Sequence, residues 1–168
     1  MIVGPTMHVL MRYADHAHDF SIDTIQAHQD LIERQGAVWL GKFGKKLARA
    51  HVLRVNQQCK EGIPTYLYLV KKRSGAYQVH RGTVTSMARV LPRGQAHLVP
   101  PYYEERRVLK HIGFWTKVTE IVRLDLYDLR HLEVAASGTD VSYALRHSMA
   151  GHFLIREIKR PALTSSLS

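Results

Sequence analysis

The chain has 168 residues, of which 45% are hydrophobic and 23% charged, and these ordinary values exclude a chain that is disordered throughout. Lys and Arg outnumber Asp and Glu by 24 to 14, for a formal net charge of +10, which favours a polyanionic partner such as nucleic acid. Cys59 is the only cysteine, which excludes an internal disulfide and a CxxC zinc site.

The N-terminal third of the chain predicts a strand, a polar loop and a helix. Residues 8–13 form a short apolar run that is typical of a strand, and the polar residues 14–19 are expected to form a loop. Apolar residues at helical spacing then predict a helix over residues 22–35. Ser21 would cap this helix at its start, and Gly36 would cap it at its end.

The middle of the chain predicts strands that are joined by turns. We expect a short strand or a turn over residues 37–43 and strands over residues 65–71 and 77–90, and the turn at Ser74-Gly75 would join the last two as a hairpin. Residues 47–55 fit a helix or a strand equally well.

A proline-rich stretch, residues 91–110, separates the hairpin from the C-terminal elements. It is expected to form a long loop, and loops of this length inside compact domains are often functional. Beyond it the sequence predicts a strand over 114–124, short helices over 125–132 and 140–149, and a last strand over 152–158.

This order of elements predicts an α+β domain, a small mixed β-barrel flanked by short helices. The absence of regular alternation between strand and helix excludes a doubly wound nucleotide fold. We expect one domain over residues 1–160 and a flexible tail over residues 161–168. The N-terminus lacks a signal-peptide pattern and no apolar run reaches the roughly 20 residues of a membrane span, so we expect a cytoplasmic protein without a membrane partner.

Trp39 is the first candidate for contact with a ligand. It follows the predicted helix end and precedes a basic, glycine-rich turn, where its ring could lie at the rim of a sheet and face a flat molecule. The alternative is packing in the core, where most tryptophan rings are largely buried.

A second aromatic group lies around the end of the proline-rich stretch and comprises Tyr102, Tyr103, Phe114 and Trp115. Aromatic faces bind bases by stacking, which is worth roughly 1–3 kcal/mol per base. We expect the two tyrosines to be exposed in the loop. Phe114 and Trp115 are neighbours on a strand and therefore point to opposite faces, so one of them belongs to the core.

A basic run, residues 41–46 (GKFGKK), has the composition of a phosphate-contacting turn, because glycine lets backbone amides and lysines approach an anion closely. It is not a Walker A loop, since only two residues separate its glycines. The alternative is a solvated basic turn. The residues expected to contact phosphate are Lys42, Lys45, Lys46, Arg12 and Arg106.

A polar cluster surrounds the end of the first predicted strand. Its members are Arg12, Tyr13, Asp15, His16, His18 and Asp19. A metal site would need a well-supported third ligand, so hydrogen bonding to the edge of a base is the favoured interpretation, with a solvated loop as the alternative. The sequence contains no G-x-S-x-G or H-E-x-x-H motif, and we expect a binding module without metal or cofactor rather than an enzyme.

Taken in order, these segments resemble the YTH and EVE families of the PUA-like superfamily over about residues 7–158. The similar segments are Arg12-Tyr13 with the helix that follows, residues 37–39 (AVW), 82–85 (GTVT), 113–118 (GFWTKV) and 125–132 (DLYDLRHL). The closing segments, residues 136–138 (ASG) and Ser148-Met149, are similar to EVE-type domains of modification-dependent restriction systems.

The resemblance implies one concave pocket into which a methylated or hydroxymethylated base of DNA or RNA is extruded. Trp39 matches the first tryptophan of the family's aromatic cage, and Tyr102, Tyr103 and Trp115 are the candidates for its second wall. Such a reader would serve modification-dependent restriction or defence, with a nuclease as its effector. The carboxylates near the family's base-reading positions are Asp15, Asp19 and Asp23.

Two alternatives stay open. ASCH domains, which are also PUA-like, include small amidohydrolases that act on modified nucleosides and need a lysine of lowered pKa. Lys117, Thr119 and Glu120 could be placed for that reaction. The other alternative is an RNA-binding module that ignores modification.

Overall fold

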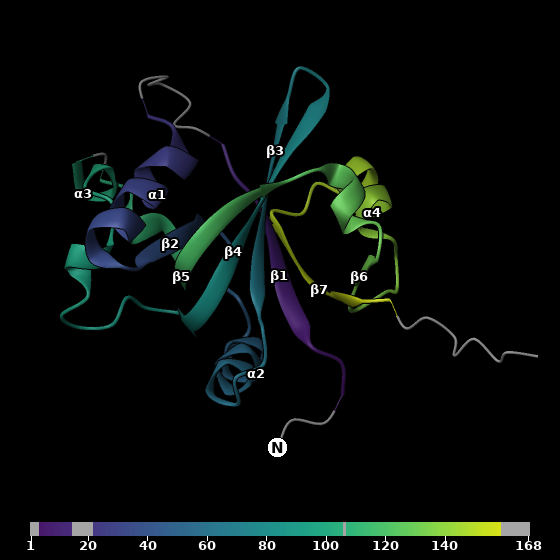
Figure 1. Cartoon of the computed structure of the whole chain (residues 1–168), viewed down its shortest axis with the longest axis horizontal. Coiled ribbons are helices and arrows are strands. Elements are labelled where there is room, and N and C mark those ends of the chain that lie inside the picture. The colour runs from purple at the N-terminus through teal and green to yellow at the C-terminus, as the bar shows by residue number, and fades with distance from the viewer. Residues whose placement is uncertain (1–3, 15–21, 106, 159–168) are drawn as a thin grey trace, which may run out of the picture.

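Seven strands form one mixed sheet in the computed structural model, which describes residues 4–14, 22–105 and 107–158 (Figure 1). The order of the strands across the sheet is β2-β5-β4-β3-β1-β7-β6. The strands are β1 (Met7–Arg12), β2 (Val38–Phe43), β3 (Tyr66–Arg73), β4 (Ala76–Ala88), β5 (Ile112–Leu124), β6 (Leu132–Val134) and β7 (His152–Glu157).

The pairing of the strands is antiparallel except between β1 and β3, which run parallel. β4 and β5 are the longest strands, and their register shifts between Gly82 and Val84 and again between Val84 and Ser86. Such irregularities bend a strand pair, and both strands curve in Figure 1. The predicted α+β class is confirmed.

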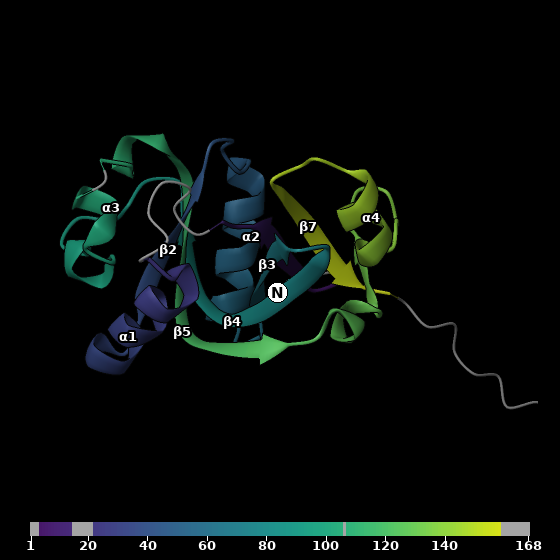
Figure 2. The same ribbon diagram turned by 90° about the horizontal axis from the view of Figure 1, so that it is seen from above.

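The helices lie around this sheet (Figures 1 and 2). At one end α1 (Thr24–Gln35) and the single turn α3 (Tyr102–Glu105) flank β2, and α4 (Val141–His147) lies at the other end beside β6 and β7. α2 (Arg49–Lys60) packs against β4. Within the described part of the chain, no helix combines the length and the apolar character that crossing a lipid bilayer requires.

Both faces of the central strands are buried, with alternate residues in different clusters. On β1, Val9 and Met11 pack with α1 and α2, while Leu10 packs on the opposite face with residues of α4. On β3, Leu67 and Tyr68 divide in the same way. This period of two is the geometry of a pleated strand.

The local predictions for the first helix are largely confirmed. Helix α1 ends at Gly36, whose φ of 84° is the left-handed conformation that glycine adopts without strain. Its N-cap is Asp23 rather than Ser21, because the Asp23 carboxylate accepts the N–H of Gln26 at 3.0 Å. Ser21 lies outside the described residues.

For two other segments the prediction was either ambiguous or wrong. Residues 47–55 contribute to helix α2, which buries Val52 and Val55 on one face. The segment predicted as a helix over residues 125–132 is instead a 3-10 turn followed by the short strand β6. Asp125 does cap that turn in a reciprocal capping box, as expected.

The proline-rich stretch folds over the sheet and does not project from it. Residues 91–105 and 107–111, which we call the cover segment, contain two 3-10 turns besides α3. Leu98 and Tyr103 of this segment pack on Trp39 of β2 and Trp115 of β5, forming a third apolar cluster. The face of β2 and β5 that would otherwise meet water is therefore interior.

Candidate nucleic-acid interface

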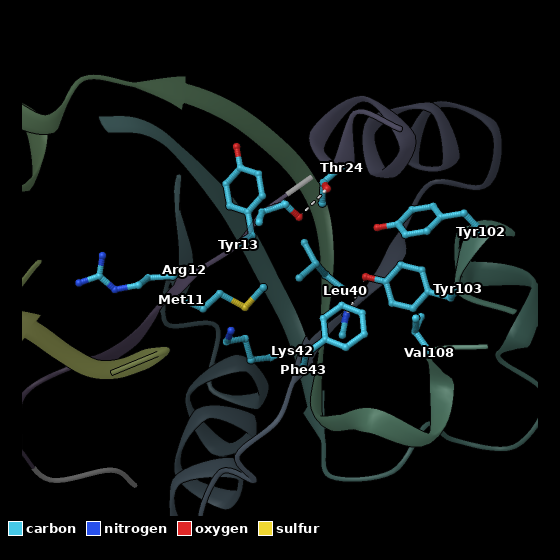
Figure 3. A pocket seen from close by; sticks show the side chains of 12 residues that line it. Met11, Arg12, Tyr13, Thr24, Leu40, Lys42, Phe43, Tyr102, Tyr103 and Val108 are labelled. Atoms are coloured by element: carbon cyan, nitrogen blue, oxygen red, sulfur yellow. Dashed lines mark hydrogen bonds between the residues drawn. The ribbon is translucent and has the colours of Figure 1, made fainter. Parts of the chain in front are cut away.

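A cavity of about 480 Å³ opens where the end of β1 faces β2, α1 and α3 (Figure 3). Four aromatic residues line it, Tyr13, Phe43, Tyr102 and Tyr103. Figure 3 shows Tyr13 on one side of the space and the two other tyrosines on the opposite side. The volume falls within the range of roughly 300–1,000 Å³ typical of small-molecule sites, and the lining suits a flat, apolar ring.

Tyr103 forms the fixed wall of the cavity, and it is only 1% exposed. Its hydroxyl lies 2.9 Å from Nε2 of His28 and accepts the backbone N–H of Gly41 at 3.2 Å. His28 in turn places Nδ1 2.6 Å from the carbonyl oxygen of Thr24. These contacts connect the cover segment to α1 and β2 through buried polar groups, which rigidify a structure when all are satisfied.

Burial lowers the pKa of His28 from 6.5 to about 4, so the ring is neutral near pH 7. The Thr24 carbonyl can only accept, so Nδ1–H donates to it and Nε2 accepts the hydroxyl proton of Tyr103. Burial also raises the pKa of Tyr103, which keeps that proton in place. The hydroxyl therefore donates to His28 and accepts from the backbone of Gly41.

Gly41 allows the Tyr103 ring to approach β2. A Cβ at this position would lie 3.1 Å from Cε2 of Tyr103 and 2.9 Å from Cδ1 of Ile112, closer than side chains tolerate without a shift. The glycine that the sequence suggested for phosphate contact thus serves the packing of an aromatic wall.

The remaining rings form walls that are more accessible. Phe43 is 44% exposed and lies nearly parallel to Tyr103, with ring centroids 6.5 Å apart and an angle of 22°. Tyr102 is half-buried, 4.7 Å from Tyr103 between centroids. Tyr13 carries the ammonium group of Lys71 5.6 Å from its ring centroid, a cation–π geometry. Positive charge therefore lies next to one of the aromatic rings that line the cavity.

Arg12 lines the cavity but directs its guanidinium at the protein backbone. Its Nη2 donates to the carbonyl oxygens of Leu145 and Ser148 at 2.7 and 2.8 Å, and Nε donates to that of Ala150 at 3.1 Å. These bonds attach the end of α4 to β1. Two of the three guanidinium nitrogens of Arg12 therefore have a structural role, and the expectation that they contact phosphate is wrong.

The lysines predicted to contact phosphate lie on β2 and in the turn that follows it. Lys42 lines it, and burial together with Arg12 lowers the pKa of its ammonium group. Lys45 and Lys46 are exposed in the turn that follows β2. That turn lies against Gly113, where a Cβ would come within 2.6 Å of the Gly44 carbonyl oxygen.

Trp39 and Trp115 are buried, at 2% and 4% exposure, and the cavity is lined by other residues. The indole N–H of Trp39 donates to Oε1 of Gln95 at 3.1 Å, within the cover segment. The prediction that Trp39 presents an open ring to a ligand is wrong, because the cover segment closes over it. Both neighbouring rings of β5 are core residues. Trp115 packs under the cover segment, and Phe114 packs in the cluster on the opposite face of the strand.

The carboxylates expected to read a base edge are not at the described part of the cavity. Asp23 is occupied as the N-cap of α1. Asp15 and Asp19 lie outside the described residues, as do the phosphate candidate Arg106 and the two histidines of the polar cluster. Among the residues that the structure describes, no three His, Cys, Asp or Glu side chains gather as metal ligands would.

The residues considered for a hydrolase lie on β5, away from the cavity lining. Lys117 places its ammonium group 5.9 Å from the Trp39 ring centroid, and Thr119 and Glu120 are exposed. Lys42 is the lysine that lines the cavity.

Sequence reasoning brought Tyr13, Tyr102, Tyr103, Arg12 and Lys42 forward, and the fold gathers these five at one cavity. It missed three other contributors, Phe43, His28 and Lys71. Phe43 could have been noticed as an aromatic residue inside the basic turn. His28 and Lys71 carry no local signal, because their partners lie at distant positions in the chain.

Comparison with known proteins gives one match. A family model described as Pua-like matches residues 9–148. No curated protein and no solved structure matches the chain.

Proposed function

The chain belongs to the Pua-like family, and on this premise we propose that it holds one modified base of a DNA or RNA strand in the aromatic cavity. Pua-like domains in general bind nucleic acid, and the net charge of +10 suits a phosphate backbone. The observation that carries the proposal is the cavity itself, which Tyr13, Phe43 and Lys42 line, with the ammonium group of Lys71 over the Tyr13 ring.

Stacking on the rings of the cavity can offset the free-energy cost of extruding a base. Extruding a base from a strand costs a few kcal/mol, and stacking on an aromatic side chain returns roughly 1–3 kcal/mol. Two open rings, Tyr13 and Phe43, therefore suffice to offset the cost. Lys42 and Lys71 would then hold the strand through its phosphates. This contribution to the binding free energy is independent of base identity.

A methyl group on the base adds selectivity. Burial of one such group is worth about 0.8 kcal/mol, which corresponds to about a fourfold gain in affinity. A hydroxymethyl group gains less unless its hydroxyl finds a partner, because an unpaired buried hydroxyl is costly.

We further propose that binding, and not catalysis, is the activity of this chain. As a reader of the EVE or YTH type it would mark modified nucleic acid for a nuclease effector in restriction or defence.

Fluorescence anisotropy with labelled DNA and RNA oligonucleotides tests this function. Matched strands would carry N6-methyladenine, 5-methylcytosine, 5-hydroxymethylcytosine or no modification. We expect one modified strand to bind about fourfold or more tightly than its unmodified match, and Tyr13→Ala to abolish that preference. Tyr127→Ala removes a tyrosine that is 70% exposed and does not line the cavity, and it should keep the preference. Equal affinity for all strands would instead favour a modification-blind RNA-binding module.

A further inference from the structure

A second cavity, of about 400 Å³, lies between the start of α2, strand β7 and the turn after β6. Its walls are mainly apolar, with Leu47, Phe153 and Leu154 among them, and two histidines, His51 and His152, complete the lining. His152 is held in place by Phe114, whose ring stands nearly perpendicular to the imidazole at 5.1 Å between centroids.

The two cavities are linked through Lys42. This residue lines the aromatic cavity, and its Cε and Nζ lie 3.3 Å from the point where a Cβ on Gly151 would stand. Gly151 immediately precedes His152 in the chain. The ammonium group of Lys42 therefore passes directly beside the backbone that carries a histidine of the second cavity.

Several basic groups converge on His152 from different elements. Burial, followed by Lys42 of β2, Lys45 of the next turn and His51 of α2, lowers its pKa. Arg12 of β1 in turn acts on Lys42. Within the described residues, no carboxylate forms an ion pair with Lys42, Lys45, His51 or His152.

Basic groups that gather without a carboxylate partner among the described residues repel one another when they are protonated, and a bound anion would relieve that repulsion. The local backbone has the same sign. The first turn of α2 contains no acidic residue, and Ala48 provides no side-chain cap for its N–H groups, so partial positive charge adds to that of the side chains.

We propose that Lys42, Lys45, His51 and His152 form a phosphate-binding subsite for the backbone phosphate next to the base in the aromatic cavity. The inference rests on the proposed function and adds to it the position of the strand. Lys42 lines the aromatic cavity and its ammonium group lies beside Gly151, the neighbour of His152, so the strand runs from Tyr13 past Lys42 toward His152. The apolar walls of the second cavity then face the neighbouring nucleotide.

The subsite makes binding depend on pH in a defined direction. A phosphodiester keeps one negative charge between pH 6 and pH 8, whereas a histidine beside it gains stability when protonated. The basic groups that face His152 oppose its protonation in the free protein, and the phosphate offsets them. Binding therefore takes up protons, and affinity rises as pH falls.

The experiment measures the dissociation constant of the preferred oligonucleotide from pH 8 to pH 6. We expect the wild-type chain to bind more tightly at pH 6 than at pH 8, by less than the roughly tenfold limit that a one-unit rise in one histidine pKa sets once the pH lies below both pKa values. His152→Gln should remove most of this gain. His97→Gln changes an exposed histidine of the cover segment outside both cavities and should retain it. Lys45→Gln, at an exposed turn that tolerates substitution, should weaken binding at every pH.

A free modified nucleoside separates the two hypotheses, because it has no phosphate. It should bind the wild-type chain and His152→Gln equally well, without pH dependence. Preference for the modified strand together with a pH response that is identical in wild type and His152→Gln would overturn the subsite and leave the proposed function standing. Lack of modification preference in the wild-type chain would overturn both.

Discussion

The hydroxyl group of Tyr103 donates to Nε2 of His28 across 2.9 Å, and this bond joins a residue of the cover segment to the middle of helix α1. Both side chains are fully enclosed. A wall of the candidate site is therefore part of the folding core, and its position depends on a histidine that is 75 residues away in the chain.

Tyr103→Phe should destabilise the protein while keeping an aromatic ring in the cavity wall. The substitution keeps the ring but leaves His28 and the N–H of Gly41 without their partner, and an unsatisfied buried polar group costs about 1–3 kcal/mol. Urea denaturation followed by circular dichroism measures the loss. Tyr143→Phe, at a residue that is 58% exposed, should change stability by less than about 0.5 kcal/mol; equal effects of the two substitutions would contradict the buried network.

Phe43→Ala should weaken binding while preserving stability. Phe43 is 44% exposed, so its truncation leaves no closed cavity in the core. Loss of one stacking ring is expected to cost roughly 1–3 kcal/mol of binding free energy, or about 5- to 150-fold in affinity. Anisotropy with the preferred strand measures the change, with Leu53→Ala, at an exposed residue of α2, as the control that should bind normally.

Trp39→Phe should show the opposite pattern. The indole packs with Leu98 and Tyr103 and donates to Gln95, so its replacement should lower the free energy of unfolding by about 1–3 kcal/mol. Affinity for the preferred strand, measured under conditions where the variant is folded, should stay within about twofold of wild type. A large and selective loss of binding to the modified strand would restore the open-ring interpretation.

Stability should fall on acidification between pH 6.5 and pH 4 because of two buried histidines. Burial lowers the pKa of His28 and, with Arg81 and His131, that of His8, each from 6.5 to about 4. Above pH 6.5 the two histidines are neutral in the folded and in the unfolded chain. Below pH 6.5 the histidines of the unfolded chain bind protons while those of the folded chain do not, until the folded chain is protonated as well below pH 4. Each histidine contributes about 3 kcal/mol to this loss. Between pH 7.5 and pH 4, the melting temperature of His28→Gln should fall less than the melting temperature of the wild-type chain.

Binding should weaken steeply as salt concentration rises, because phosphate contacts release counter-ions. The double substitution Lys45→Gln and Lys46→Gln should reduce the slope of log affinity against log salt by about 2. Lys60→Gln, at the opposite end of α2 from this turn, should leave the slope unchanged. A slope that is shallow in the wild-type chain would argue against backbone contact.

The elements that were predicted correctly have local signals. Helix α1 follows from apolar spacing and the Gly36 cap, and the β3–β4 hairpin follows from alternating strands around Ser74 and Gly75. The boundaries of β1 and β5 moved by only one or two residues. Each of these features is decided by residues close together in the chain, which is why a sequence pattern can report it.

Burial of the aromatic rings has no such local signal. Trp39 and Trp115 both stood out in the sequence as rings available to a ligand, yet they pack with Tyr103 inside the protein. The burial of Trp39 depends on whether residues 56 or more positions later in the chain fold over the sheet, and the spacing of residues along a helix or strand does not predict that contact.

By itself, the sequence determined the class of the domain, its positive charge and a short set of residues that meet at one cavity, because composition and spacing act locally. Only the tertiary structure decided which rings face that cavity and which are sealed. The cover segment gains more free energy by burying the apolar face of β2 and β5 than by remaining in water, so Tyr13 and Phe43, rather than Trp39, are left open to a base.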